Sequence, residues 1–159
     1  MAVTIRRATT QDYEALCEII EEVDALHRQA LPHIFQTSGG PTRERVYMLG
    51  LLADEDHGLF VAEVAGQVAG FLHVTVRDAP PIPILVPRRV AVVDNIAVKE
   101  AHRRAGLGRA LMSRAEQWAQ AKGTVEVELN VYEFNETAIA FYERLGYQAF
   151  SRRMGKRLD

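Results

Sequence analysis

The segment from Val90 to Trp118 constrains the fold and the function of this chain more than any other. It begins with an apolar, β-branched run typical of a buried strand, passes through a short polar loop, and reaches two glycines that precede an amphipathic helix. The first N–H groups of a helix have no partner within the helix and lie at the positive end of its dipole. This order of elements therefore predicts a binding site for an anionic, phosphate-bearing ligand.

The two glycines match neither of two common phosphate-binding motifs. The dinucleotide fingerprint needs a third glycine at position 111, and the P-loop needs Gly-Lys-Ser/Thr over 111–113, where this chain reads Leu-Met-Ser. What remains is a loop whose glycines let the backbone approach a pyrophosphate and whose arginines supply positive charge. Its residues are Arg103, Arg104, Ala105, Gly106, Leu107, Gly108 and Arg109. The alternative interpretation is a helix start with solvated arginines.

Size and composition indicate one globular domain over residues 1–159. The chain is 48% hydrophobic and 25% charged with a net charge of −2, so no overall basic field points to nucleic acid. Its single cysteine, Cys17, leaves no intramolecular disulfide and indicates a reducing compartment. No signal peptide is apparent, and no run approaches the roughly 18 apolar residues of a membrane-spanning helix. We therefore expect a cytoplasmic domain without a membrane or nucleic-acid partner.

The N-terminal part begins with a strand and two helices. Val3–Arg6 alternates apolar and polar residues like a half-buried strand, and Thr9 is suited to cap the next helix. That helix has apolar residues near a 3.6-residue period from Tyr13 to Leu26, and Pro32 prevents its continuation. Thr42 is suited to cap a second, shorter helix.

Two β-rich runs, 58–64 and 67–76, are separated by Ala65-Gly66 and predict a hairpin. The proline-rich segment 78–87 predicts an irregular exposed loop, whose apolar side chains indicate either a contact surface or cover for a neighbouring strand.

The C-terminal part continues the alternation of strands and helices. Gly123 is suited to end the helix of the opening segment, and 125–131 alternates like a strand. Asn135 caps a further helix that ends at Gly146, and 147–158 predicts a basic edge strand. The sequence therefore predicts an α/β sheet with helices on its faces.

Two segments together resemble the GNAT superfamily of N-acetyltransferases. Arg103-x-x-Gly106-x-Gly108, after the strand end Ile96-Ala97-Val98, resembles the acetyl-CoA pyrophosphate motif of that superfamily. The segment 130–147 resembles its asparagine-capped helix ending in Phe-Tyr-x-x-Leu-Gly-Tyr. The resemblance covers essentially the whole chain. It implies a single-domain α/β (α+β) fold with a central mixed, largely antiparallel twisted sheet of six to seven strands, about four flanking helices, and a splay between two central parallel strands.

The resemblance also implies roles for individual residues. Backbone groups of Ile96, Ala97 and Val98 would hold the pantetheine arm of acetyl-CoA like an added strand, and 103–109 would hold the pyrophosphate. Asn135 would contact the cofactor arm. Tyr142 would lie near the thioester sulfur and deliver or share a proton with the departing thiolate. The alternative for Tyr142 is a core aromatic on a helix face.

The general base is less clearly indicated. Many relatives carry a glutamate on one of two strands. One of these positions is Asn130 in this chain and the other falls near Val92, and neither side chain can take a proton. Asp94 is the first candidate, with partnership to a nearby arginine as its alternative, and Glu128 is the second. An α-amine of pKa about 8 would need less help than a lysine amine of about 10.4, so a water chain could suffice.

The expected function is transfer of the acetyl group of acetyl-CoA to a primary amine of a small molecule or peptide, by direct attack through a tetrahedral intermediate. The segment 26–35 would form a wall of the acceptor pocket, with His27 and His33 as candidate contacts. No metal is expected, because the histidines lack a ligand spacing. The resemblance allows a homodimer through the C-terminal strand edge. The alternative function is a catalytically silent, CoA-binding regulatory module on the same fold.

Overall fold

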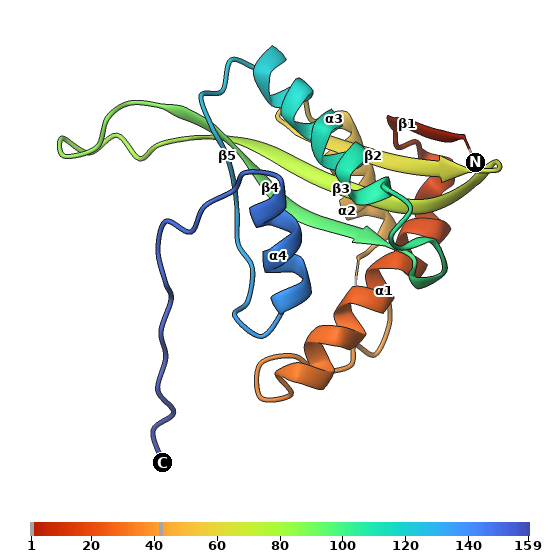
Figure 1. The fold of residues 1–159 in the computed structure, drawn as a ribbon, viewed down its shortest axis with the longest axis horizontal. Helices are drawn as coiled ribbons and strands as arrows, with labels where there is room; N and C mark the ends of the chain where they lie inside the picture. Colours follow the sequence, from red (N-terminus) through yellow and green to blue (C-terminus); the bar gives the residue numbers. More distant parts are fainter. Residues whose placement is uncertain (1, 42) are drawn as a thin grey trace.

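The computed structural model describes residues 2–41 and 43–159, which form one five-stranded sheet with helices on both faces (Figure 1). The strands follow the order β1-β2-β3-β4-β5. Their bounds are Val3–Arg7 for β1, His57–Val64 for β2, Gln67–Asp78 for β3, Arg89–Val98 for β4 and Val127–Leu129 for β5. The helices are α1 (Tyr13–Ala30), α2 (Arg45–Ala53), α3 (Leu107–Ala121) and α4 (Glu136–Arg144), with short 3₁₀ turns at Thr10–Asp12 and Glu100–His102.

The sheet is mixed and largely antiparallel, as predicted. β1 to β4 pair antiparallel with their neighbours, and β4 pairs with β5 in parallel. The predicted hairpin is confirmed, because Ala65 (φ 51°) and Gly66 (φ 78°) form a two-residue turn between β2 and β3. Two positive φ angles match the right-handed twist of the flanking strands.

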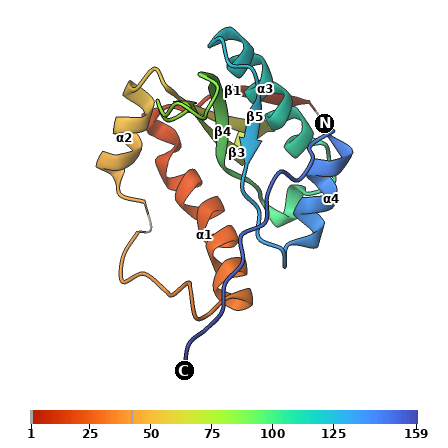
Figure 2. The ribbon, with the colours of Figure 1, turned by 90° about the vertical axis from the view of Figure 1, so that its left-hand side faces the viewer.

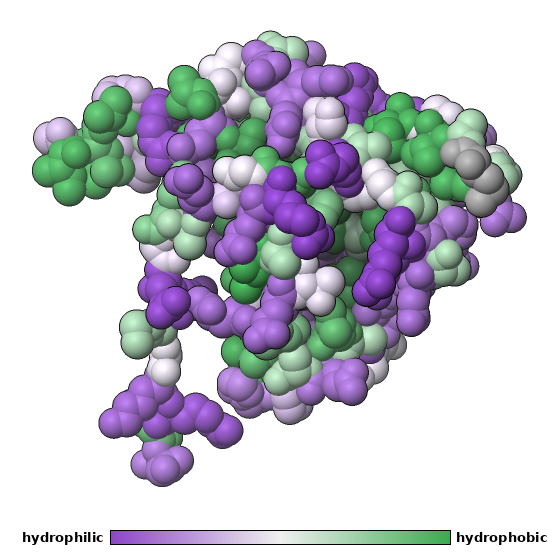
Figure 3. All heavy atoms as spheres, in the orientation of Figure 1, coloured by the Kyte–Doolittle hydropathy of each residue, from purple (hydrophilic) through white to green (hydrophobic). Residues whose placement is uncertain are grey.

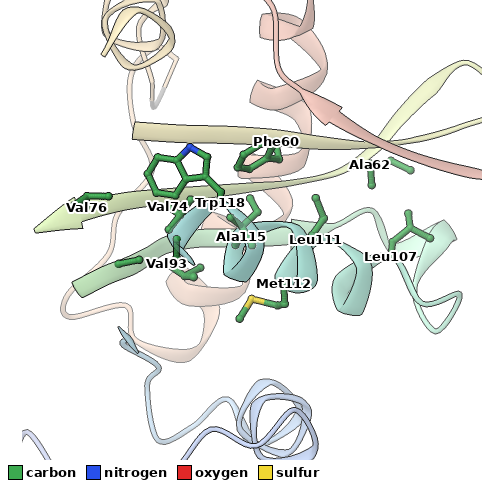
Figure 4. Packing of buried hydrophobic residues seen from close by; sticks show 14 of the residues in the cluster. Phe60, Ala62, Val74, Val76, Val93, Leu107, Leu111, Met112, Ala115 and Trp118 are labelled. Carbon is green, nitrogen blue, oxygen red and sulfur yellow. The ribbon is translucent and has the colours of Figure 1, made fainter. Parts of the chain in front are cut away.

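The helix α3 packs its apolar stripe across one face of the sheet (Figure 4). Leu111, Met112, Ala115 and Trp118 repeat at helical spacing and are buried against the even-numbered positions of β2 and β3. Side chains of α4, among them Phe141 and Tyr142, pack onto the edge of the same core. This face is a continuous apolar core.

The helices α1 and α2 cover the opposite face (Figure 2). Leu16, Ile19 and Ile20 of α1 and Met48 and Leu51 of α2 are buried in this second core. The strands contribute odd-numbered positions of β2 and β3, together with Ala97 of β4.

The ion pairs of Arg6 with Asp12 and Glu63, which we call the polar lock, fix the start of α1 to the sheet. The Arg6 guanidinium donates to both carboxylate oxygens of Asp12 (2.8 and 2.9 Å) and to Glu63 (2.9 Å). Thr9 is the N-cap of the 3₁₀ turn Thr10–Asp12 and forms a capping box with Asp12, in which the Thr9 N–H donates to Asp12 Oδ2 at 2.7 Å. Hydrogen bonds from Arg6 hold the pKa of the Asp12 carboxyl below its usual range. The predicted cap Thr42 lies outside the described residues, and Glu44 stands at the N-cap of α2.

The predicted count of six to seven strands is too high, because the segment 147–158 forms no strand. Residues 148–159 are exposed and run away from the body of the molecule (Figure 1). Phe150, Met154 and Leu158 are 68–88% exposed, so no sheet face in the described residues buries the apolar positions of this segment. β5 is consequently an edge strand, and the parallel pair β4–β5 lies at the edge rather than in the centre of the sheet.

The proline-rich segment between β3 and β4 forms the predicted exposed loop. It projects beyond the sheet (Figure 1), and its tip gathers apolar side chains, seen at the left of Figure 3. Ile84 and Val86 are 87% and 74% exposed, so these side chains do not cover a neighbouring strand. Within the described residues, no helix combines the length and the apolar character needed to cross a membrane.

Candidate active site

Two β-bulges direct polar side chains of three strands to the α1/α2 face. In β3, Ala69 has no partner on β2, because Ala62 pairs with Gly70 and Glu63 with Val68. In β4, Asp94 is the extra residue, because Val93 pairs with Val74 and Asn95 with His73. A bulge shifts the register by one residue and so exchanges the faces of all following side chains.

These shifts bring together a polar cluster that includes His57, His73, Thr75, Asp94 and Asn95. The cluster forms the floor of a cavity of about 230 Å³. Apolar side chains of α1, α2 and the sheet form its walls: Ile20, Met48, Leu51, Leu59 and Phe71. Arg43, Tyr47 and Arg77 complete the lining.

The carboxylate of Asp94 is held by two donors. The Thr75 hydroxyl donates to Oδ2, and the Arg77 guanidinium donates to Oδ1 at 2.7 Å. Asp94 therefore does partner a nearby arginine and also lines the cavity.

Two histidines lie next to this carboxylate. His57 Nδ1 and His73 Nε2 are 2.9 Å apart, and His73 Nδ1 lies 4.0 Å from Asp94 Oδ2. Burial lowers the pKa of His73, while Asp94 acts in the opposite direction and His57, Arg77 and Arg43 lower it further. The His73 imidazole is therefore neutral at neutral pH and has one nitrogen lone pair available to accept a proton.

The loop before α3 has an unusual backbone. Arg104 (φ 64°) and Gly106 (φ 83°) are left-handed, and Gly106 is the N-cap of α3 without a side-chain cap bond. The Ala110 N–H bonds to Gly106 O at 3.0 Å, and the helix amides before Ala110 have no helical carbonyl ahead of them. Left-handed turns that lead into a helix gather N–H groups into an anion-binding concavity, so this donor set fits a pyrophosphate.

The strand end before this loop presents a free backbone edge. β5 pairs only with Ala91–Val93 of β4. Lys99 N–H bonds to Ala69 O of β3, so by alternation the backbone groups of Ile96 and Val98 point away from β3, toward the side of β5. Part of this edge is used by the chain itself, because Arg103 Nε donates to Val98 O at 3.1 Å.

The helix α4 lies on the α3 side of the sheet, where Phe141 and Tyr142 pack against the core. Asn135 caps α4, with its Oδ1 accepting from Ala138 N–H at 3.2 Å. A Cβ at Gly108 would lie 3.1 Å from the Phe141 ring, so this glycine allows α3 and α4 to approach closely. Tyr142 packs against the α3 core, and burial raises its pKa to about 12, which keeps the phenol protonated.

The other candidates from the sequence lie elsewhere. Glu128 pairs with Arg88 (3.3 Å) and does not line the cavity. His27 lies among the rings of Phe35, Tyr132 and Phe134, with its Nδ1 2.9 Å from Val23 O. His33 is exposed in the turn after α1. Among the residues that the structure describes, no group of three or more His, Cys, Asp or Glu side chains is arranged to hold a metal ion.

Sequence reasoning missed His57, His73 and Thr75. The hairpin turn places position 57 opposite position 74 if the strands run without interruption, which puts His57 and His73 on opposite faces. The bulge at Ala69 moves His57 opposite Thr75, and therefore onto the same face as His73. Gly70, next to Ala69 in the interior of the strand, is the sequence signal that could have indicated this bulge.

Comparison with known proteins agrees with this architecture. The family model described as "Acetyltransferase (GNAT) family" matches residues 20–147. An uncharacterised N-acetyltransferase of Methanocaldococcus jannaschii is 36% identical over 104 residues, which is 65% of this chain and 45% of the relative. The chain therefore spans less than half the length of that relative.

Solved structures share the fold over nearly the whole chain. A mutant of the BH1408 protein from Bacillus halodurans superposes with a TM-score of 0.93 at 26% identity, covering 98% of this chain and 99% of that one. The aminoglycoside N-acetyltransferase AAC(6')-Iy, solved in complex with CoA, has a TM-score of 0.74 at 16% identity with the same coverage, a likeness of fold alone. With a family model that matches most of its length, this chain belongs to the acetyltransferase (GNAT) family.

Proposed function

We propose that the chain transfers the acetyl group of acetyl-CoA to a primary amine of a small molecule or peptide. The observation that carries this proposal is the backbone edge of β4 at Ile96 and Val98, which β5 leaves uncovered. The cavity with Asp94 and Asn95 lies on one face of the sheet, Tyr142 packs on the other, and the free edge at Ile96 and Val98 lies between them.

The cofactor half of the proposal rests on backbone groups. Amides at the start of α3 would hold the pyrophosphate, with charge from Arg103, Arg104 and Arg109. The edge from Ile96 through Ala97 to Val98 would hold the pantetheine arm, which requires Arg103 Nε to release Val98 O or to share it. Asn135 would contact the arm through its amide nitrogen, because its oxygen caps α4. A fold neighbour has been solved in complex with CoA, which supports CoA as a ligand of this fold.

Bound acetyl-CoA supplies an acyl group on a thiol leaving group. The cavity would hold the amine beside Asp94, and a backbone N–H on the free edge would stabilise the oxyanion that follows attack. Tyr142 would donate a hydrogen bond to the developing thiolate. A phenol of pKa about 12 donates this bond without ionising at any physiological pH.

The proposal also includes a cytoplasmic location, which rests on the single thiol of the sequence, and a homodimer through the open outer edge of β5. Sedimentation of the purified chain as a monomer at all concentrations would exclude the homodimer.

The test is thiol release from acetyl-CoA in the presence of a panel of amines: a peptide with a free N-terminus, L-ornithine, spermidine, an aminoglycoside and glucosamine-6-phosphate. We expect CoA binding in the micromolar range by calorimetry and amine-dependent thiol release with at least one member. Absence of CoA binding would overturn the proposal. Tight CoA binding without transfer across the panel would instead support the catalytically silent module.

A further inference from the structure

The hydrogen bond between His57 and His73 has one donor and one acceptor, and the surroundings of His57 determine which is which. His57 Nε2 faces the Asp54 carboxylate at 3.7 Å, and a carboxylate favours a proton on the nitrogen that faces it. The same carboxylate is anchored by the Asp56 N–H, which donates to Asp54 Oδ1 at 2.8 Å. A neutral imidazole carries one proton, so His57 Nδ1 is left as the acceptor.

The tautomer of His57 determines the tautomer of His73. The two ring planes are inclined by only 22°, so the N–H of one ring can point at the in-plane lone pair of the other. Because His57 Nδ1 accepts, His73 Nε2 must carry the proton of the 2.9 Å hydrogen bond. The lone pair of His73 therefore lies on Nδ1, beside Asp94.

Thr75 gives its one hydroxyl proton to Asp94 Oδ2, so its oxygen can act toward the histidines only as an acceptor. In this arrangement the protonated His73 Nε2 lies 3.5 Å from that oxygen, and His57 Nδ1, 3.3 Å away, makes no hydrogen bond with it. Two acceptors, His73 Nδ1 and Asp94 Oδ2, thus lie 4.0 Å apart at the cavity floor without a proton between them. A single protonated nitrogen can reach both at ordinary hydrogen-bond distances of about 2.8 Å.

Exposure rises along the row of side chains that leads away from this point. The side chains of His73, His57 and Asp54 are 12%, 23% and 52% exposed. The row therefore connects the cavity floor to solvent at the end of α2, away from the strand end at Ile96–Val98.

We propose that His73 Nδ1 takes the proton of the acceptor amine, that Asp94 holds the ammonium beside it, and that His57 and Asp54 conduct the proton to solvent. This assignment rests on the proposed function and deepens it, by replacing a bare carboxylate with a histidine relay as the general base.

The ammonium held by Asp94 first gives one proton to the lone pair of His73 Nδ1, which frees the nitrogen lone pair for attack. The Nε2 proton of His73 moves to His57 Nδ1, and the Nε2 proton of His57 leaves to Asp54 or water. Attack then forms the N–C bond, and the C–S electron pair departs with the sulfur. The second excess proton of the nitrogen passes through water to the departing thiolate. The rings return to their first tautomers when the product leaves and water refills the cavity.

The first arm of the test needs no acceptor. Nitrogen-15 NMR of the histidine rings in the full chain at neutral pH reports which nitrogens carry protons. We expect His73 and His57 both protonated on Nε2, and we expect Asp54→Asn to redistribute the His57 tautomers while Glu55→Gln, the neighbouring exposed carboxylate, leaves them unchanged. A proton on His73 Nδ1 in the wild type would overturn the relay, whatever the acceptor panel shows.

The second arm uses the best amine of the panel. His73→Gln should lower kcat by about 100-fold, with a smaller loss for His57→Gln and Asp54→Asn and little change in the KM for acetyl-CoA. The kcat of the wild type should fall only below pH 6.5, the ordinary pKa of histidine. Asp94→Asn should shift this fall in kcat to lower pH, because the Asp94 carboxylate raises the pKa of His73.

Imidazole in the buffer should partly restore His73→Ala, which a merely structural role of His73 would not allow. The proposal would be overturned if His73→Gln kept the kcat of the wild type and the same fall of kcat at acidic pH. If no amine of the panel were acetylated, the result would count against the proposed function. The NMR measurement would still show which ring nitrogens carry the protons.

Discussion

The two faces of the sheet are filled in different ways. On one face α3 lies across the central strands, and its apolar stripe leaves a dry core. On the other face α1 and α2 leave a cavity between them, whose floor is a set of charged and polar side chains. One face stabilises the sheet, and the other offers room and chemistry. Both faces contain an apolar core, and the polar cavity occupies only part of the α1/α2 face.

Trp118→Ala should produce the largest loss of stability, about 4 kcal/mol in the free energy of unfolding. Trp118 is 9% exposed and packs against Phe60 and Val74, so its removal leaves a large void in the dry core. His57→Gln on the cavity face should cost about 1 kcal/mol, the value of one hydrogen bond. Urea denaturation of both variants measures the difference. Equal losses would contradict the division between the faces.

Tyr142→Phe tests the one residue of the packed face to which we assign chemistry. We expect kcat to fall about 100-fold, or about 2.7 kcal/mol, with CoA affinity and stability nearly unchanged. Because burial raises its pKa to about 12, the phenol should cause no loss of rate up to pH 10. Tyr147→Phe is the matched control, since Tyr147 donates to Glu116 in the same ring cluster. Similar kcat losses in both variants would reduce Tyr142 to a core aromatic.

Asp12→Asn tests the polar lock that ties α1, and with it the cavity face, to the sheet. We expect a loss of about 2 kcal/mol at pH 7, because the variant weakens the charge-assisted bonds from Arg6. The folded pKa of Asp12 is lowered, so the wild-type contribution is complete above its ordinary value of 3.8 and disappears as the pH falls through the folded value. The two unfolding curves should therefore converge in acid.

Glu14→Gln is the control for this pH dependence. The Glu14 side chain is 80% exposed in its pair with Arg45, so we expect a change below about 0.5 kcal/mol at any pH. A gap between wild type and Asp12→Asn that persists into acid would show that the carboxylate charge is not what the lock uses.

Gly106→Ala should have a small effect on stability and a separate effect on binding. Its φ of 83° is left-handed, which costs a Cβ-bearing residue about 1 kcal/mol. Gly66→Ala, at φ 78° in the β2–β3 turn, should cost about the same. Calorimetry should show weaker CoA binding for Gly106→Ala alone. Equal CoA affinity in the two variants would place the pyrophosphate elsewhere.

The parts of the fold that follow from local signals were predictable. The turn at Ala65-Gly66, the cap at Asn135 and the left-handed Gly123 and Gly146 lie where the sequence predicts them, because each depends on backbone conformations that few residue types favour. The loop of 103–109 is of the same kind, since its proposed donors are backbone amides. Its binding role stays a prediction.

The parts that depend on tertiary register were not predictable. The side chains of the cavity floor come from three strands, and two bulges decide which of them share a face. The segment 147–158 is predicted from its sequence as a basic edge strand, but a strand also needs an edge to pair with and a face to cover, which its own sequence does not encode. Asp94 was predictable as a polar residue near the strand end, whereas its partnership with Thr75 and His73 was not.

We propose that the cofactor and the acceptor meet at the uncovered backbone edge of β4 from opposite faces of the sheet. Amide and histidine NMR spectra recorded first with CoA and then with added acceptor amine test it most directly. We predict that CoA perturbs the amides of Ile96, Val98 and Leu107–Arg109, and that the amine then perturbs His57, His73 and Asn95. Perturbation by CoA confined to residues outside β4 and the start of α3 would contradict the account.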